Sequence, residues 1–204
     1  MPNILHPDLF PLGYPLLRRA WFLEPGLFDV VAPLGTTWIR ASASPAGGFK
    51  DDVNGWGGGG AFAFDEEACA ELASFSVQVG DSQFCRPAAN TEAGDSWVKR
   101  AGGTVLVSAD RGRPDGTPGL ADNCVGSVVR SGQAAAINQG GASAGDDGDA
   151  LPLGFGGRGA SATVAAWYGG GGGRVSGSFK WPMKPAGDGR VCLEFFRRNP
   201  DLDL

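Results

Sequence analysis

Runs of consecutive glycine constrain the fold of this chain more than any other feature of its sequence. Glycine occupies 35 of the 204 positions and is concentrated in residues 47–60 and 139–173, which include uninterrupted runs at 57–60 and 169–173. A glycine run is poor material for a packed β-strand, because it loses much backbone entropy on folding and offers no side chain to a core. A collagen fold is excluded, because the glycines do not recur at every third position.

Two interpretations of the glycine runs remain open. Flexible glycine linkers lack large apolar residues, whereas these runs adjoin aromatic side chains and have strand-like sequence on both sides. Alternatively, extended segments resembling polyproline II pack side by side where no Cβ intervenes, and their backbone N–H and C=O groups bond neighbouring segments. The adjoining aromatic residues favour this ordered packing, and they are Trp56, Phe62, Phe64, Phe155, Trp167 and Tyr168.

Alternation of apolar and polar residues with a period of two predicts β-strands along most of the chain. In the clearest example, Phe75 and Val77 share one face and Ser76 lies on the other. The same pattern predicts strands at 27–32, 36–43, 73–79, 104–109, 161–168 and 190–196, with a seventh at 175–181.

Helical signals are weak. The only helical signal lies in residues 65–73, with Asp65 in an N-cap position and acidic residues in the first turn. One short helical turn is possible there. Proline–glycine combinations predict turns, including those at 33–35 and 114–116. We expect an all-β domain, a β-sandwich or jelly-roll-like fold with long glycine-rich, polyproline-II-like loops.

Charge and residue usage exclude several classes of function. The net charge of −5 argues against nucleic-acid binding. His6 is the only histidine, so histidine-based acid–base chemistry and zinc binding have almost nothing to use. The 22 acidic residues show no spacing that selects the carboxylate pair of a glycosidase. The glycine run at 57–60 is not a phosphate-binding loop, because no Lys-Ser/Thr pair follows it. We expect no enzymatic activity and no cofactor.

The cysteines and the apolar segments indicate in which cellular compartment the chain is expected to fold. No CxxC motif occurs, so we expect four small buried or half-buried thiols, with a single disulfide as the alternative. Prolines interrupt the first twenty residues, which show no signal peptide. No segment approaches the ~20 apolar residues of a membrane helix, so we expect folding in the cytoplasm and no membrane insertion. The cysteines are Cys69, Cys85, Cys124 and Cys192.

Residues 21–48 show a specific order of elements. A Pro-Gly turn, an alternating strand and a Pro-x-Gly turn precede a second strand that ends in small residues and a glycine pair. This order resembles the opening of the glycine-rich domain in fibre and tail-tip proteins of tailed phages. Residues 75–81, 94–112 and 156–173 are similar to the later strands and the closing glycine-rich repeat of that family. The resemblance implies a virion surface protein, usually trimeric and often receptor-binding, and similar parts occur in gene transfer agents and other phage-like particles.

Residues 1–20 differ from the glycine-rich β domain that we assign to residues 21–204. They are rich in proline and in apolar residues that form no core of their own, which suits an arm that docks on another virion protein. Packing of this arm on its own domain is the alternative. The candidate anchor residues are Leu5, Leu9, Phe10, Leu12, Leu16, Leu17, Arg18 and Arg19.

Loops on a β scaffold commonly carry binding residues, and glycan recognition uses flat aromatic faces together with planar polar groups. Three loop clusters fit this chemistry, although each also fits a solvated polar loop. The acidic cluster at 146–149 also offers carboxylate oxygens for Ca²⁺, but it lacks the twelve-residue spacing of a calcium-binding loop, so we expect no metal site there. The candidate receptor contacts are Asp51, Asp52, Asn54 and Trp56; Asp115, Asp122 and Asn123; and Asp146, Asp147 and Asp149.

We therefore expect a virion fibre or spike protein that attaches the particle to host-surface glycan. It would be made in the host bacterial cytoplasm and released by lysis. The expected partners are two further copies in a homotrimer, other virion proteins and a host polysaccharide, because three copies of a weak site gain avidity. The alternative is a purely structural virion component, such as a fibre base, connector or decoration protein. A secreted lectin or an ice-binding protein fits less well, because no export route and no regular glycine repeat are evident.

Overall fold

The computed structural model describes residues 15–49, 56–85, 89, 91–136, 139–144 and 186–197. Within these ranges the secondary structure consists of β-strands and short 3₁₀ helices and contains no α-helix, which confirms the all-β expectation for this part of the chain. The strands are β1 (Leu16–Phe22), β2 (Gly26–Val31), β3 (Trp38–Ser44), β4 (Phe62–Ala68), β5 (Ser74–Val79), β6 (Ser96–Arg100), β7 (Val105–Ala109), β8 (Val128–Arg130) and β9 (Arg190–Phe196). The 3₁₀ helices are η2 (Ser82–Cys85), η3 (Glu92–Gly94) and η4 (Ala121–Asn123).

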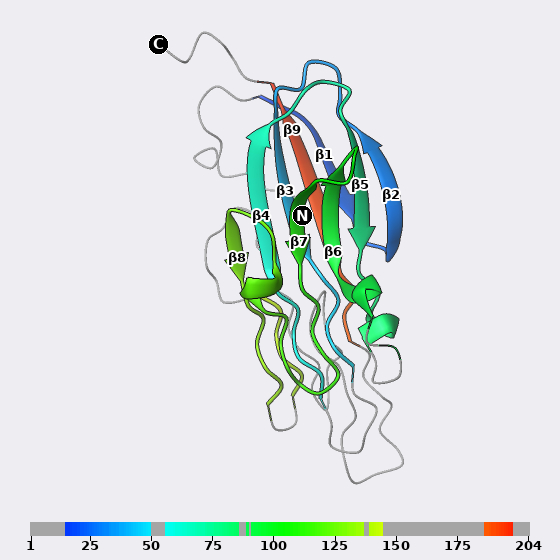
Figure 1. The fold of residues 1–204 in the computed structure, drawn as a ribbon, viewed down its shortest axis with the longest axis vertical. Helices are drawn as coiled ribbons and strands as arrows, with labels where there is room; N and C mark the ends of the chain where they lie inside the picture. Colours follow the sequence, from blue (N-terminus) through cyan, green and yellow to red (C-terminus); the bar gives the residue numbers. More distant parts are fainter. Residues whose placement is uncertain are drawn as a thin grey trace, which may run out of the picture.

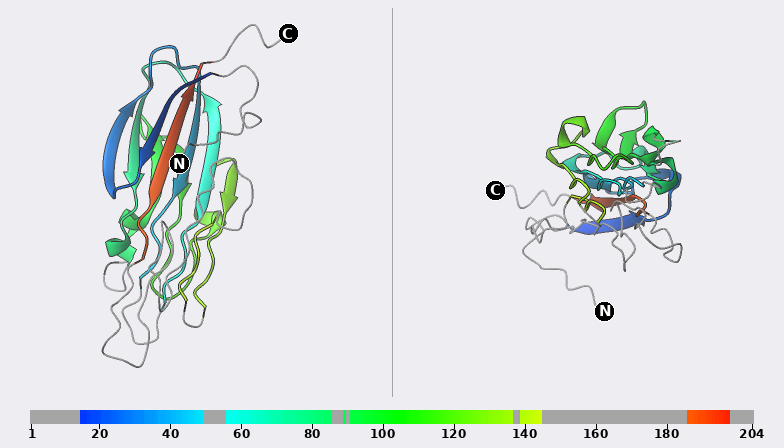
Figure 2. Two further views of the ribbon diagram at one scale, coloured as in Figure 1. Left: turned by 180° about the vertical axis from the view of Figure 1, so that it is seen from behind. Right: turned by 90° about the horizontal axis from the view of Figure 1, so that it is seen from below.

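Two antiparallel sheets pack face to face (Figure 1; Figure 2). Sheet A has the strand order β1-β9-β3-β4-β8, and sheet B has the order β2-β5-β6-β7. Phe75 of β5 and Phe195 of β9 meet between the sheets, with their ring centroids 6.1 Å apart. Burial of one face of each sheet supplies the main stabilising contribution of such a layered fold. The core includes Val30, Ile39, Ala41, Phe75, Val77, Val98, Val107, Val191, Leu193 and Phe195.

The strands predicted from alternation at 27–32, 36–43, 73–79, 104–109 and 190–196 are confirmed as β2, β3, β5, β7 and β9. The strands predicted at 161–168 and 175–181 lie outside the described residues. Alternation did not identify β1, β4, β6 and β8. The sequence of β1, LLRRAWF, does not alternate apolar and polar residues, and β8 has only three residues.

The short helical turn considered at residues 65–73 is not present, because strand β4 occupies residues 62–68. Its acidic residues lie opposite β3, where Arg40 Nε donates a hydrogen bond of 2.6 Å to Glu66 Oε2. Arg100 of β6 reaches across to Glu67, with 2.8 Å between Nε and Oε1. These carboxylates therefore pair with cations on other strands and do not interact with a helix N-terminus.

One row of alternating charge crosses four neighbouring strands of sheet A. Arg19, Glu194, Arg40 and Glu66 occupy one level of the β1-β9-β3-β4 register. Glu194 is only 2% exposed, and Arg19 Nε donates a 2.6 Å hydrogen bond to its Oε1. Opposite charges across a sheet favour the register that brings them together, so this row helps to fix the alignment of β1 at the sheet edge.

Strand β1 extends across residue 20, where the boundary between an N-terminal arm and the β domain is expected from the sequence. The expected anchor residues of 16–19 are part of this strand, and the side chain of Arg19 is bound to Glu194. Residues 16–20 therefore belong to the folded domain, and the arm hypothesis now concerns only the residues before them. The other expected anchors, Leu5, Leu9, Phe10 and Leu12, lie outside the described residues.

All four cysteines are free thiols, so the alternative of one disulfide is wrong. Three of them are buried and Cys124 is partly buried, as expected. Burial raises the pKa of the Cys85 thiol to about 12 and that of Cys124 to about 11. These thiols are therefore protonated near neutral pH, which lowers their reactivity.

Candidate binding site at the end of the glycine bundle

Extended segments continue from the strands beyond one end of the two sheets and lie side by side (Figure 1). They belong to no strand, yet backbone hydrogen bonds connect them to one another. We call this part the glycine bundle, and it comprises residues 45–49, 56–61, 110–120, 131–136, 139–144 and 186–189.

Residues 56–61 form the centre of the glycine bundle, and all of them are buried. Their backbone groups are bonded to four surrounding segments, 45–49, 110–120, 131–136 and 139–144, as buried backbone groups require. This run is therefore ordered and is not a flexible linker, whereas the run at 169–173 lies outside the described residues. The contacts are Gly48 N to Gly58 O (2.8 Å), Gly58 N to Arg113 O (3.0 Å), Gly59 N to Gln133 O (3.0 Å), Ala61 N to Asp110 O (2.9 Å), Gly119 N to Gly59 O (2.9 Å), Gly141 N to Gly57 O (3.0 Å) and Ala144 N to Gly60 O (3.0 Å).

The central glycines leave no room for a side chain. A Cβ added to Gly57 would lie 1.9 Å from the carbonyl oxygen of Gly48, and one added to Gly58 would lie 2.1 Å from that of Thr117. Successive glycines face different neighbours, whereas Gly60, three residues after Gly57, faces the 45–49 segment again. A repeat of three residues is the period of polyproline II, in which close lateral packing requires glycine.

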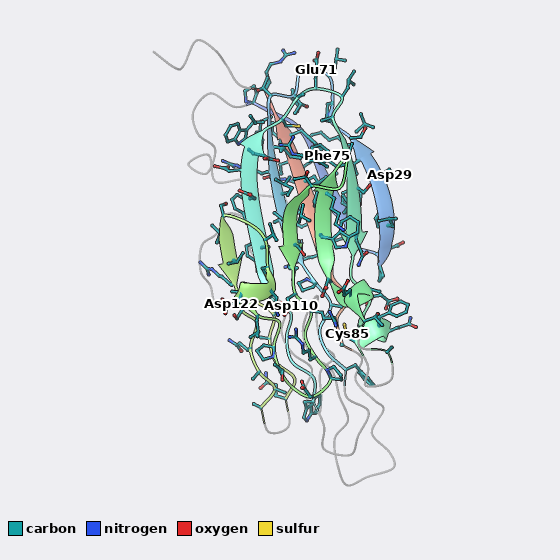
Figure 3. All side chains as sticks on the ribbon, in the orientation of Figure 1. Asp29, Glu71, Phe75, Cys85, Asp110 and Asp122 are labelled. Atoms are coloured by element: carbon teal, nitrogen blue, oxygen red, sulfur yellow. The ribbon has the colours of Figure 1, made fainter. Side chains whose placement is uncertain are left out.

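Asp110 fixes the base of the 110–120 hairpin where the glycine bundle joins the sheets (Figure 3). This buried carboxylate accepts hydrogen bonds from Arg113 Nη2 at 3.1 Å and from Leu120 N at 2.9 Å. Asn123 Nδ2 donates a third bond of 3.0 Å, and the Asp110 carbonyl accepts one of 2.9 Å from Ala61 N. A buried charge with this many donors is well compensated, so Asp110 joins the hairpin, η4 and the central segment into one unit.

At its far end the hairpin closes in the turn expected at 114–116. Gly116 N donates to Arg113 O at 3.2 Å, and the φ of +91° at Gly116 favours glycine. Asp115 Oδ1 accepts a 2.8 Å bond from Thr117 N, and this bond is the main reason that the pKa of Asp115 lies below its usual range. The side chain of Asp115 is exposed, so the turn presents a permanent negative charge.

A second hairpin lies beside this turn. Ala135 N donates a 3.0 Å hydrogen bond to Gly116 O, and Ala136 and Gln139 exchange bonds of 2.9 and 3.2 Å where the second hairpin closes. The backbone of the central segment also reaches this point, because Trp56 O lies 3.3 Å from the Cβ position of Gly116. We call residues 56, 114–117, 135, 136 and 139 the tip. The tip is built from three segments that are distant in sequence; Trp56 and Pro114 are buried in it, whereas Asp115, Thr117, Ala136 and Gln139 are exposed.

The structure separates the residues proposed as receptor contacts. Asp115 is exposed at the tip, whereas Asp122 and Asn123 are exposed in η4, at the sheet end of the same hairpin. The amide of Asn123 is bonded to Asp110. Trp56 lies at the tip but is only 5% exposed, so the expectation of an aromatic face open to a sugar is wrong in its case. The others, Asp51, Asp52, Asn54, Asp146, Asp147 and Asp149, lie outside the described residues.

The sequence did not indicate the residues that build the tip around Asp115. Thr117 supplies the N–H that orients the carboxylate, and Arg113 and Asp110 hold the hairpin that carries it. The Pro-Asp-Gly turn was the only available signal, although these partners lie in the same 110–120 hairpin as Asp115. Among the described residues, no group of three or more His, Cys, Asp and Glu side chains is placed to hold a metal ion.

Comparison with known proteins adds no relative: a scan against protein-family models and a search of curated proteins found no match. Within the described ranges, no helix has the length and apolar character needed to cross a membrane.

Proposed function

We propose that this chain is a surface-attachment protein of a phage or phage-like particle and that its tip binds a host-surface glycan. The observation that carries the proposal is the polarity of the fold. Strands β1 and β9 meet where Leu16 pairs with Phe196, and Arg197 N donates a 3.1 Å hydrogen bond to Pro15 O. The first and last described residues are therefore neighbours, and they lie at the end of the sheets opposite the glycine bundle (Figure 2).

This polarity suits attachment. A protein held by segments that precede β1 or follow β9 would direct its tip away from the particle. The glycine bundle, proposed to be a group of polyproline-II-like segments, holds the tip at a fixed distance because its centre is bonded on several sides. Rigid support of this kind lowers the ordering cost of binding.

The chemistry of the tip suits a polar ligand. The pKa of Asp115 lies below its usual range and its carboxylate is oriented by Thr117, so this exposed anion suits hydrogen bonds from sugar hydroxyls. A single small site of this kind binds weakly, and the proposed homotrimer would offer three copies of it.

A purely structural role in the particle is the second candidate. Leu34 and Leu72 are 71% and 57% exposed in loops joined by a 2.7 Å bond from Gly35 N to Glu71 Oε2. These loops lie at the same end as the first and last described residues, where a virion partner would cover them.

Binding to cells separates the two candidates. Purified protein, with its mass measured by light scattering, is mixed with susceptible cells and with cells that lack the receptor. The attachment proposal expects an oligomer that binds only susceptible cells. A folded oligomer that binds neither kind of cell would leave the structural role.

A further inference from the structure

Among the residues that the structure describes, strand β2 lies at the edge of sheet B and pairs with β5 alone. Ala32, directly after β2, exchanges backbone hydrogen bonds with the two residues before β5 (Ala32 N to Ala73 O, 2.9 Å; Leu72 N to Ala32 O, 3.2 Å). Backbone groups of successive residues point to opposite sides of a strand. The N–H and C=O groups of Leu27, Asp29 and Val31 are therefore directed away from β5, toward the open edge.

The same three residues form an exposed row of side chains. Leu27 is 67% exposed and Val31 is 50% exposed. Asp29, which is labelled in Figure 3, is exposed as well and lies between them along β2. Ser76 of β5 donates a 3.0 Å hydrogen bond to Asp29 Oδ1, which orients the carboxylate on the outer face of the sheet. An apolar–acidic–apolar row thus coincides with a set of open backbone donors and acceptors.

The other sheet edges carry features that discourage strand addition. Strand β1 has a register shift and two adjacent arginines, and β8 has only three residues. Strand β7 forms a bridge between Ser108 and Val125. In contrast, β2 has six regularly paired residues and large exposed aliphatic side chains.

We propose that the β2 edge binds an extended segment of a partner protein as an added antiparallel strand. The segment carries a basic residue opposite Asp29 and apolar residues two positions to either side, opposite Leu27 and Val31. Main-chain hydrogen bonds supply affinity in this mode of recognition, and alternate side chains supply specificity. The charge of Asp29 selects a basic centre, since opposite charges on paired strands attract.

A second copy of this chain does not suit the edge. The antiparallel register that aligns Leu27, Asp29 and Val31 of one copy with the same residues of another sets Asp29 against Asp29, and like charges placed directly opposite are destabilising. The inference stands on the β2 edge alone and is independent of glycan binding at the tip.

The test is a titration of the ¹⁵N-labelled full chain with the blocked heptapeptide Thr-Val-Thr-Lys-Thr-Leu-Thr, followed by two-dimensional NMR. The matched control peptide has Glu in place of Lys. We expect the amide signals of Leu27, Asp29 and Val31 to shift, and the Lys peptide to bind about two- to five-fold more tightly than the Glu peptide. The Asp29→Lys variant, checked for an unchanged melting temperature, should reverse this preference.

Three outcomes would overturn the proposal. The first is that millimolar Lys peptide leaves the β2 amide signals unchanged. The second is that both peptides bind equally to the protein and to the Asp29→Lys variant. The third is that the protein alone forms an oligomer that Asp29→Lys alters, because the occupant of the edge would then be a second copy.

Discussion

Replacing Gly58 with alanine tests whether the glycine bundle depends on close backbone contact. The added Cβ would lie 2.1 Å from the carbonyl oxygen of Thr117, whereas ordinary contacts begin near 3.4 Å, so the 110–120 hairpin would have to move by about 1.3 Å. That movement disrupts the bonds Arg113 N to Thr117 O and Gly58 N to Arg113 O. Overpacking costs about 1–3 kcal/mol and each lost bond about 0.5–1.5 kcal/mol, offset by up to about 1 kcal/mol of unfolded-state entropy.

The expected net loss is about 3 kcal/mol, or a fall in melting temperature of about 6–12 °C, measured by calorimetry. The matched control is Gly102→Ala in the β6–β7 hairpin, where an added Cβ has nothing within 4 Å and only the φ of +94° opposes the change. Backbone strain alone should cost the control about 1 kcal/mol. The reasoning fails if Gly58→Ala is no more destabilising than Gly102→Ala.

Three further predictions concern buried charge and buried thiols. Arg19→Met should lower the free energy of unfolding, measured by urea denaturation, by about 3 kcal/mol, because it leaves the Glu194 carboxylate buried without its partner. The double variant Arg19→Met/Glu194→Leu should recover most of this loss. In the native state, iodoacetamide should modify the partly buried Cys124 before Cys85 and Cys192, as read by peptide mass spectrometry, and equal rates would contradict the assigned burial. Burial raises the pKa of Cys85 from 9.0 to about 12, so between these pH values the folded chain binds more protons than the unfolded chain. The free energy of unfolding should therefore fall as the pH rises above about 9, and it should fall less in the Cys85→Ala variant.

Much of the fold could be predicted from the sequence where one face of a strand is buried. Phe75 and Val77 alternate with polar residues because β5 has a core face and a solvent face. Prediction failed at β4, where Asp65, Glu66 and Glu67 imitate a helix start. In the structure Glu66 and Glu67 pair with arginines on other strands, and Asp65 accepts a hydrogen bond from the backbone N–H of Glu66. Tertiary partners of this kind cannot be recognised from local sequence.

The candidate site was predictable only in part. The turn around Asp115 followed from local chemistry, since a Pro-Asp-Gly sequence carries its own conformational preference. The position of Trp56 did not follow, because its burial depends on segments far away in the chain. Likewise, Gly58 faces Thr117 and Arg113, and no sequence pattern relates these residues.

The most direct test of the central claim is polysaccharide binding by two matched variants, Asp115→Asn and Asp122→Asn. Each replaces one exposed carboxylate, Asp115 in the turn at the tip and Asp122 in η4, next to the sheet end of the 110–120 hairpin. Binding to immobilised host-surface polysaccharide is measured for the two variants and the unmodified protein, with their melting temperatures as a check on folding. Glycan binding at the tip predicts that Asp115→Asn weakens binding several-fold while Asp122→Asn does not. Equal binding by the two variants, or no binding by the folded protein, would contradict it.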